Sequence, residues 1–232
     1  MTIEHEALYR QRFADVSRRK RAGMWEVLCR SVLQRHVQPT GTVLDLGAGF
    51  CEFINAIRCA RKIAVDTNPG LREFAAPDVE KVVGEIPSVL RTLGDASVDV
   101  VFCSNFFEHL CDKGTVLAVL RQVHRLLTAD GRLLVIQPNI RYAYKEYWDF
   151  FDHHVALSDR SLREALQMTG FDIEVLRPRF LPYTTKSRLP QAAWIVRLYL
   201  ALPPVQWLFG KQMLVVARKT TGPRPAGAQV LS

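Results

Sequence analysis

Acidic residues are missing from the last 58 positions of this 232-residue chain, where nine Lys and Arg follow Glu174. The first 36 residues hold eight Lys and Arg against four acids, whereas residues 37–174 hold fourteen against nineteen. A near-neutral body between two basic ends predicts an anionic partner, such as a membrane surface, a phosphorylated substrate or a nucleic acid. Basic helices that serve only solubility would give the same pattern.

The sequence also lacks any Cys-x-x-Cys pair. Its five cysteines are odd in number and fall on segments predicted as helices, a loop and a strand. This arrangement disfavours both a disulfide framework and a zinc site, and indicates reduced, mostly buried thiols. The N-terminus opens with acids and then bases, without the apolar run of a secretory signal. We therefore expect a cytoplasmic protein.

Internal repeats and low-complexity tracts are absent too. A content of 48% hydrophobic and 23% charged residues is typical of a globular protein, and the length suits one decorated domain. We expect a single domain over residues 1–219, with a helical extension over 1–38 and a lid-like insertion over 180–210. The Pro- and Gly-rich tail over 220–232 is expected to be disordered.

Short apolar runs alternate with helical patterns through the middle of the chain. We expect helices over 51–58, 87–93, 117–127 and 158–169, and an N-terminal helix over about 4–36 that could break near Gly23. The expected strands are 42–46, 62–68, 79–86, 97–105, 132–139, 171–179 and 211–219. This alternation predicts an α/β fold with a doubly wound, mostly parallel sheet, whose strand carboxyl ends share one edge.

Three sequence features predict where helices begin or end. Ala129-Asp130-Gly131 is expected to end the helix before the fifth strand. Ser158 is expected to cap the next helix, and Gly170 to end it.

The segment TVLDLGAGFCEFINAI, residues 42–57, predicts a strand, a glycine loop and a helix that together bind a nucleotide. A dinucleotide oxidoreductase would show Gly-x-Gly-x-x-Gly, but Glu52 stands at the sixth position here. Asp45 just before the loop would repel a pyrophosphate. It suits a ligand that carries a positive amino group and no phosphate, although it could instead cap the loop.

Two further acids end the next two strands. Asp66 is placed to accept hydrogen bonds from both ribose hydroxyls. Glu85 is placed to accept from an adenine amino group or to line its pocket. The sequence shows no phosphate-binding feature. These two acids and Asp45 therefore predict S-adenosylmethionine as the ligand.

Four segments carry a family resemblance: VLDLGAG, AVDTNP, VDVVFCSNFFEHL and LLTADGRLLVIQPN. In this order they resemble the motifs of class I S-adenosylmethionine-dependent methyltransferases of the small-molecule type, over about residues 40–175. The resemblance implies a Rossmann-like, seven-stranded sheet whose last strand is antiparallel. It also implies S-adenosylmethionine as cofactor and S-adenosylhomocysteine as product.

The same resemblance implies roles for individual residues. Asp45, Gly47 and Gly49 would hold the methionine moiety of the cofactor. Asp66 would hold the ribose. Glu85 would lie by the adenine, and Asn105 would contribute backbone near the methionine end. In one departure, Cys51 stands where the family loop usually carries its last glycine.

Methyl transfer from a sulfonium is an in-line displacement, so the protein must align donor and acceptor and remove a proton if the acceptor is a hydroxyl. His154 and His153 are candidate general bases, oriented by Asp149 or Asp152, and His109 is a third candidate. Each histidine could instead have only a structural role. We expect no metal, because adjacent residues such as Asp152-His153-His154 rarely point at one ion.

The apolar segment over residues 191–210 is interrupted by Arg197 and by Pro203-Pro204, so it is too short and too broken to span a bilayer. It could form a helical lid over the acceptor site, closed by its own tryptophans against the core. It could instead dip into an anionic membrane surface, which would suit a membrane-peripheral protein with a lipid-linked acceptor.

These features predict an S-adenosylmethionine-dependent methyltransferase (EC 2.1.1) that O-methylates a hydroxyl of a small molecule: a sugar, a glycolipid or a secondary metabolite. One alternative is a nucleic-acid methyltransferase. Another is an inactive cofactor-binding interaction module. Asn105-Phe106-Phe107-Glu108 replaces the Asn/Asp-Pro-Pro-aromatic stretch usual for base N-methylation, which disfavours nucleic acid as the partner. Formation of an oligomer stays open.

Overall fold

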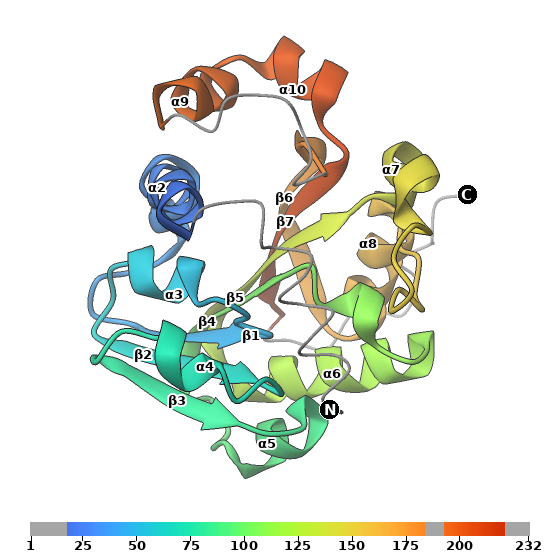
Figure 1. Cartoon of the computed structure of the whole chain (residues 1–232). Coiled ribbons are helices and arrows are strands. Elements are labelled where there is room, and N and C mark those ends of the chain that lie inside the picture. Colours follow the sequence, from blue (N-terminus) through green and yellow to red (C-terminus); the bar gives the residue numbers. More distant parts are fainter. Residues whose placement is uncertain (1–17, 184–192, 221–232) are drawn as a thin grey trace.

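The computed structural model describes residues 18–183 and 193–220 (Figure 1). Within them one seven-stranded sheet runs in the order β3-β2-β1-β4-β5-β7-β6. Strands β1 to β5 pair in parallel with their neighbours, whereas β7 lies antiparallel between β5 and β6. The strands are β1 Thr42–Leu46, β2 Arg61–Asp66, β3 Val79–Val83, β4 Val98–Ser104, β5 Leu127–Pro138, β6 Phe171–Leu181 and β7 Gln212–Lys219. The predicted α/β sheet with an antiparallel last strand is confirmed.

Helices cover both faces of this sheet, so its central strands are apolar on both sides. Leu44 and Leu46 of β1 belong to one buried cluster, which includes residues of α5, α6 and α8. Val43 belongs to a second cluster, built with α2, α3 and α4. The bounds are α2 Arg18–Leu28, α3 Glu52–Ala56, α4 Leu71–Phe74, α5 Ile86–Thr92, α6 Lys113–Leu126 and α8 Asp159–Met168.

The remaining described helices connect the strands at the C-terminal half of the sheet. Helix α7 (Ile140–Tyr147) follows β5. Helices α9 (Ala193–Ala201) and α10 (Pro203–Phe209) lie between β6 and β7 in the sequence, where α9 packs against α2 and α10 against β6. Figure 1 shows α9 and α10 above the sheet, with α2 beneath α9. Among the described residues, no helix is both long and apolar enough to cross a membrane.

Local capping signals hold where they were expected. The Ser158 side chain accepts a hydrogen bond from the Ser161 backbone, and the Ser161 side chain accepts one from the Ser158 backbone, so the two serines form a capping box at the start of α8. Gly170 follows the helix with a φ of +92°. The predicted cap and the predicted end of this helix are both confirmed.

Several boundaries differ from the sequence expectation. Helix α6 ends at Leu126, and Ala129-Asp130-Gly131 lies inside β5 instead of ending the helix. Leu126 and Leu127 are both fully buried, so the chain turns directly from helix to strand to bury both side chains. Strand β3 stops at Val83, because Glu85 already serves as the N-cap residue of α5.

The N-terminal helix is described only in part. Helix α2 continues into a π-helical turn (Cys29–Leu33) and a 3-10 turn (Gln34–His36). Gly23 lies within α2 and does not break it. The part of the predicted helix before residue 18, and residues 221–232 of the tail predicted over 220–232, lie outside the described residues.

Candidate active site

The glycine loop after β1 is fixed to the neighbouring strand β2. The backbone N–H groups of Gly47 and Ala48 both donate to the carbonyl of Val65, at 2.9 and 3.1 Å. Gly47 has a φ of +72°, and a Cβ atom there would lie 2.9 Å from the Phe106 ring. A side chain at position 47 would therefore be strained and would collide with the segment after β4.

Cys51 adopts the left-handed conformation, with a φ of 61°, at the N-cap of α3. An L-residue in this conformation costs about 1–2 kcal/mol, a cost that glycine avoids. The position where the family loop usually carries a glycine thus keeps the glycine backbone conformation. The Cys51 side chain is fully buried, and burial raises the pKa of its thiol.

Asp66 at the end of β2 holds the glycine loop. One carboxylate oxygen accepts the Gly49 N–H at 2.7 Å, and the other accepts the Asn68 N–H at 2.7 Å. Burial raises the pKa of Asp66, and these hydrogen bonds only partly offset it. The backbone of Thr67 also donates to this carboxylate. A carboxylate has about four lone-pair sites, so the group keeps capacity to accept from a ribose hydroxyl.

Asp45 on β1 is almost completely buried and accepts a hydrogen bond from the backbone of Ile54 on α3. Its pKa lies well above the usual range, first because of burial and then because of the charges of Asp66 and Glu52. The carboxyl group therefore ties α3 to the sheet beside the loop. Its contact with the methionine moiety stays a prediction.

Glu85 and Asn105 lie at the carboxyl ends of β3 and β4. The Glu85 side chain is exposed, and its backbone carbonyl accepts from Val89 and Ser88 in α5. Asn105 has a φ of +49°, and its side-chain oxygen accepts from the Gln212 amide at 2.8 Å. Together with Asp66 these residues form an edge where the predicted cofactor residues meet.

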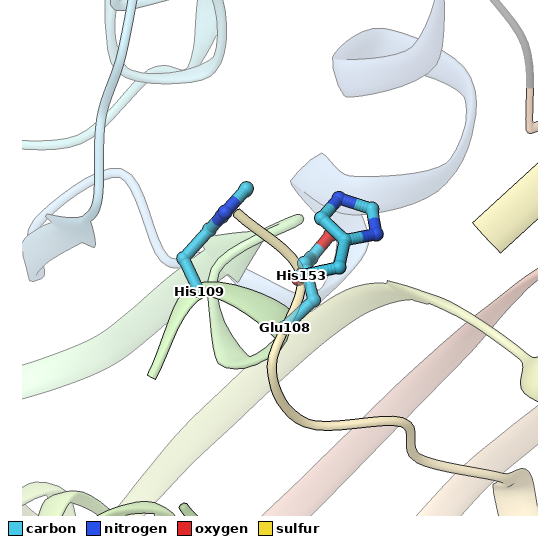
Figure 2. A group of neighbouring side chains, drawn as sticks. All are labelled: Glu108, His109 and His153. Carbon is cyan, nitrogen blue, oxygen red and sulfur yellow. The ribbon is translucent and has the colours of Figure 1, made fainter. Parts of the chain in front are cut away.

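A second group of side chains gathers around Glu108, in the short 3-10 helix Phe107–His109 after β4 (Figure 2). The buried Glu108 carboxylate accepts from the Gln137 amide on β5 at 2.6 Å. Burial raises the pKa of Glu108, against the opposing charge of His109. The Glu108 carbonyl accepts the N–H groups of His154 and Val155, at 2.7 and 3.2 Å. This backbone contact brings the loop after α7 to the end of β4.

His109 pairs with Asp152 of that loop. Its Nδ1 lies 3.2 Å from the Asp152 carboxylate and 3.1 Å from the Asp152 carbonyl. Burial lowers the pKa of His109, but the Asp152 hydrogen bond and the charges of Glu108 and Asp152 outweigh it, so the pKa is raised. The side chain remains 32% exposed. This geometry orients the imidazole through Nδ1, and within the described residues no hydrogen bond involves its other nitrogen, Nε2.

The two histidines of the loop are placed differently from each other. His153 is buried, its Nδ1 donates to the Tyr147 carbonyl at 2.9 Å, and its ring stacks on Phe150. The His109 and His153 ring centroids lie 5.1 Å apart, edge to face. The His154 side chain is exposed, and its backbone makes the contact with Glu108. The structure therefore brings His109 and His153 together, but not the His154 side chain.

Residues 44–135 match the family described as "Methyltransferase domain". These residues form a class I methyltransferase domain. The cofactor of this methyltransferase is S-adenosylmethionine. No curated protein matches the chain.

Solved structures resemble this methyltransferase over most of its length. A SAM-dependent methyltransferase from Archaeoglobus fulgidus has a TM-score of 0.67 at 20% identity, covering 93% of this chain and 100% of that one. A putative methyltransferase from Bacillus halodurans has a TM-score of 0.62 at 18% identity, covering 83% and 99%. A Haloferax volcanii putative methyltransferase, in complex with the Trm112 activator, has a TM-score of 0.64 at 16% identity, covering 93% and 99%. At these identities the likeness is one of fold.

The residues at the carboxyl edge fit S-adenosylmethionine. The Gly47 loop keeps its backbone open, since a Cβ atom would not fit there. The Asp66 carboxylate is held by backbone donors and retains capacity to accept from a hydroxyl. Neither feature requires a phosphate on the ligand.

The sequence marked His109 and His153 as candidate bases, but it did not predict that they form one group with Glu108. Their potential ligand atoms lie within 4.8 Å of one another, which makes them a candidate cation cluster among the described residues. Figure 2 shows that Glu108 and His109 come from one short helix and His153 from a separate loop. Glu-His after one strand, and Asp-His-His after the neighbouring strand, is the signal that would have found them. Asp152, expected to orient a neighbouring histidine, contacts His109 instead.

Proposed function

We propose that this methyltransferase O-methylates a hydroxyl group of a small-molecule acceptor, with His109 as the general base. The observation that carries the proposal is the contact between His109 and the Asp152 carboxylate. It lies at the end of β4, next in the sheet to β1 and its glycine loop. Methyl transfer to a hydroxyl group needs a proton acceptor close to the methyl donor.

The proposed methyl transfer accounts for every bond and proton with the acceptor, S-adenosylmethionine and the His109–Asp152 pair. The acceptor oxygen forms a bond to the methyl carbon as the bond from that carbon to the sulfonium sulfur breaks, which leaves S-adenosylhomocysteine. The hydroxyl proton passes to Nε2 of His109. The Asp152 carboxylate stabilises the imidazolium that results, because it already accepts from Nδ1.

In this proposal, the residues at the carboxyl ends of the strands each contact a different part of the cofactor. Asp66 accepts from the ribose hydroxyls, and Glu85 lies by the adenine. Asp45 and the glycine loop, Gly47 to Gly49, face the methionine end. The backbone of Asn105 completes that end, since its left-handed conformation turns the chain at the end of β4.

His153 has a positioning role in this proposal. It is wedged between Phe150 and the Tyr147 carbonyl, and its ring meets the edge of His109. Since its Nδ1 donates to a carbonyl, His153 fixes the loop that carries Asp152. His154 is the weaker of the expected bases, because its side chain is exposed while its backbone holds Glu108.

The acceptor class follows from the aromatic surface near the pair. Tyr144, Trp148 and Phe151 are exposed on α7 and the loop after it, and Phe151 directly precedes Asp152. Exposed aromatic rings bind acceptors that have a ring or an apolar face. Sugars, glycolipids and other hydroxylated ring compounds meet this description.

The test is transfer of a labelled methyl group from S-adenosylmethionine to a panel of hydroxylated small molecules, with transfer RNA as a comparison. The proposal expects label on an acceptor oxygen and S-adenosylhomocysteine in equal amount. Label on nucleic acid alone would support the competing activity. Cofactor binding without turnover on any acceptor would favour an inactive binding module.

A further inference from the structure

Large apolar side chains lie exposed on the outer side of helices α9 and α10. The two tryptophans there are 67% and 69% exposed. We call this set the α9–α10 outer face: Trp194, Leu198, Leu202, Trp207, Leu208 and Phe209. Six exposed apolar side chains on two consecutive short helices and the residue between them indicate an interaction site, because isolated ones are ordinary but gathered ones are not.

Helices α9 and α10, which carry the α9–α10 outer face, are held in place by hydrogen bonds and packing. The Gln206 side chain, which is buried, donates to the carbonyls of Tyr199 and Leu200 at the end of α9. The Tyr199 hydroxyl donates to the carbonyl of Phe180 on β6. Helix α9 also packs against α2. The exposure of the tryptophans is therefore a property of the fold rather than of a frayed helix.

A second anchor ties α10 to β6. The Arg179 guanidinium donates to the carbonyls of Leu208 and Gly210, at 2.7 and 3.0 Å. The same guanidinium lies 5.3 Å from the Trp207 ring and 4.7 Å from the Tyr142 ring. The Arg179 side chain therefore links α10 to α7, on which the Tyr144 ring is exposed as well.

Charge decides which partner this surface fits. Arg197 is the one charged residue in the segment from 193 to 209, and its side chain is exposed. Residues 175–232 carry nine Lys and Arg and no acid. A second copy of this chain, with a formal net charge of +8, would bring like charges together. An anionic surface is the complementary partner.

Tryptophan, leucine and arginine together suit the boundary of a lipid bilayer. Tryptophan rings prefer the headgroup level, leucine side chains enter the acyl boundary, and arginine keeps its charge at the phosphates. Helix α9 has nine residues and so extends about 14 Å, less than half of a bilayer core. The helices would lie in the plane of the interface.

We propose that the α9–α10 outer face docks this methyltransferase on an anionic lipid bilayer. The proposal goes beyond the methyl-transfer function and does not rest on it, since none of these residues belongs to the cofactor edge or to the His109 group.

Vesicle flotation of the full-length protein tests the proposal. Vesicles of phosphatidylcholine with about 30% phosphatidylglycerol are compared with pure phosphatidylcholine. We expect binding to the anionic vesicles at least about tenfold tighter, weakening as salt rises. Equal binding to both compositions, or no binding to either, would overturn the proposal.

Variants assign the binding to this surface. Trp194→Ser combined with Trp207→Ser should weaken binding to anionic vesicles about tenfold or more, since apolar area is lost. Arg197→Glu should weaken it about fivefold or more. Met168→Ser, which removes an exposed apolar side chain from α8, is the matched control and should bind as the wild type does.

Two readouts keep the outcome clear. Affinity for S-adenosylhomocysteine reports whether each variant is folded, and it should stay unchanged in all of them. Sedimentation of the free protein reports self-association. If the tryptophan variant bound vesicles like the wild type, or if its only defect were loss of a dimer, the outer face would not be a membrane surface.

Discussion

Nδ1 of His109 lies 3.2 Å from the carboxylate of Asp152, a residue 43 positions further along the chain. The backbone contact of Glu108 with His154 and Val155 places the two side chains together. An imidazole held in this way has one tautomer and one orientation fixed, which is what a general base requires. The pair links the short helix after β4 to the loop after α7.

The pH dependence of turnover should follow this pair. A general base works in its neutral form, so activity rises with pH through the raised pKa of His109. Asp152→Asn removes the carboxylate that raises this pKa, so the acidic limb of the kcat/KM profile should move to lower pH. The maximum rate should fall as well. A limb that stays in place would show that another group titrates.

Stability should depend on pH through the same contact. A histidine whose pKa is raised on folding stabilises the folded state below its unfolded pKa of about 6.5, and loses this contribution as pH rises through the folded value. Asp152→Asn should therefore lower Tm more at pH 5.5 than at pH 8.5, two values chosen about one unit below and two units above that unfolded pKa. The difference should be modest, because His109 is 32% exposed. An equal loss of Tm at both pH values would argue against the ion pair.

Asp66 should matter for cofactor affinity. Asp66→Ala removes the proposed ribose acceptor and also the partner of the Gly49 N–H. Loss of two hydrogen bonds to a charged group should weaken binding of S-adenosylhomocysteine on the order of a hundredfold, measured by calorimetry. Asp78→Ala removes an exposed carboxylate that pairs with Lys62 and should leave the affinity unchanged. Unaltered affinity in Asp66→Ala would remove the ribose assignment.

Cys51 should tolerate glycine better than a branched residue. Cys51→Gly relieves the left-handed strain at φ 61° and should keep S-adenosylhomocysteine affinity within about threefold, despite the small cavity left behind. Cys51→Val places a β-branched side chain in that conformation and should weaken binding or lower Tm clearly. Equal behaviour of the two variants would show that the backbone conformation at this position is not what matters.

Turnover should not depend on a divalent cation. In the described residues, Nδ1 of His109 and Nδ1 of His153 are both directed at protein oxygens, on Asp152 and Tyr147. We therefore expect the Glu108 group to act through hydrogen bonds. Incubation with a chelator, followed by removal of the chelator, should leave the rate unchanged. Loss of activity that returns with one added metal would instead make the group a metal site.

Much of the fold could be predicted because its signals are local. The alternation of apolar runs predicted the sheet, and Ser158 and Gly170 predicted the ends of α8. The end of α6 could not be predicted in this way. Asp130 and Gly131 are typical of a turn, but burial of Leu126 and Leu127 placed them in β5.

The candidate site likewise has one part that local sequence patterns predict and another part that they do not. Asp66 and the glycine loop are close in the chain, and the sequence pattern was enough to expect them together. The partner of His109 depends on how a loop 43 residues away folds back on Glu108, which no local pattern specifies. The exposure of Trp194 and Trp207 is of the same kind, since apolar residues are expected inside unless the surrounding elements leave them out.

The most direct test of the account compares His109→Gln with the wild type, with acceptor turnover and S-adenosylhomocysteine affinity measured on the same preparations. The account predicts a fall in kcat of about 10²–10⁴ with an affinity that changes less than about twofold. His36→Gln, which changes a half-buried histidine outside the site, should match the wild type in both. Full turnover in His109→Gln would contradict the assignment of His109 as the base.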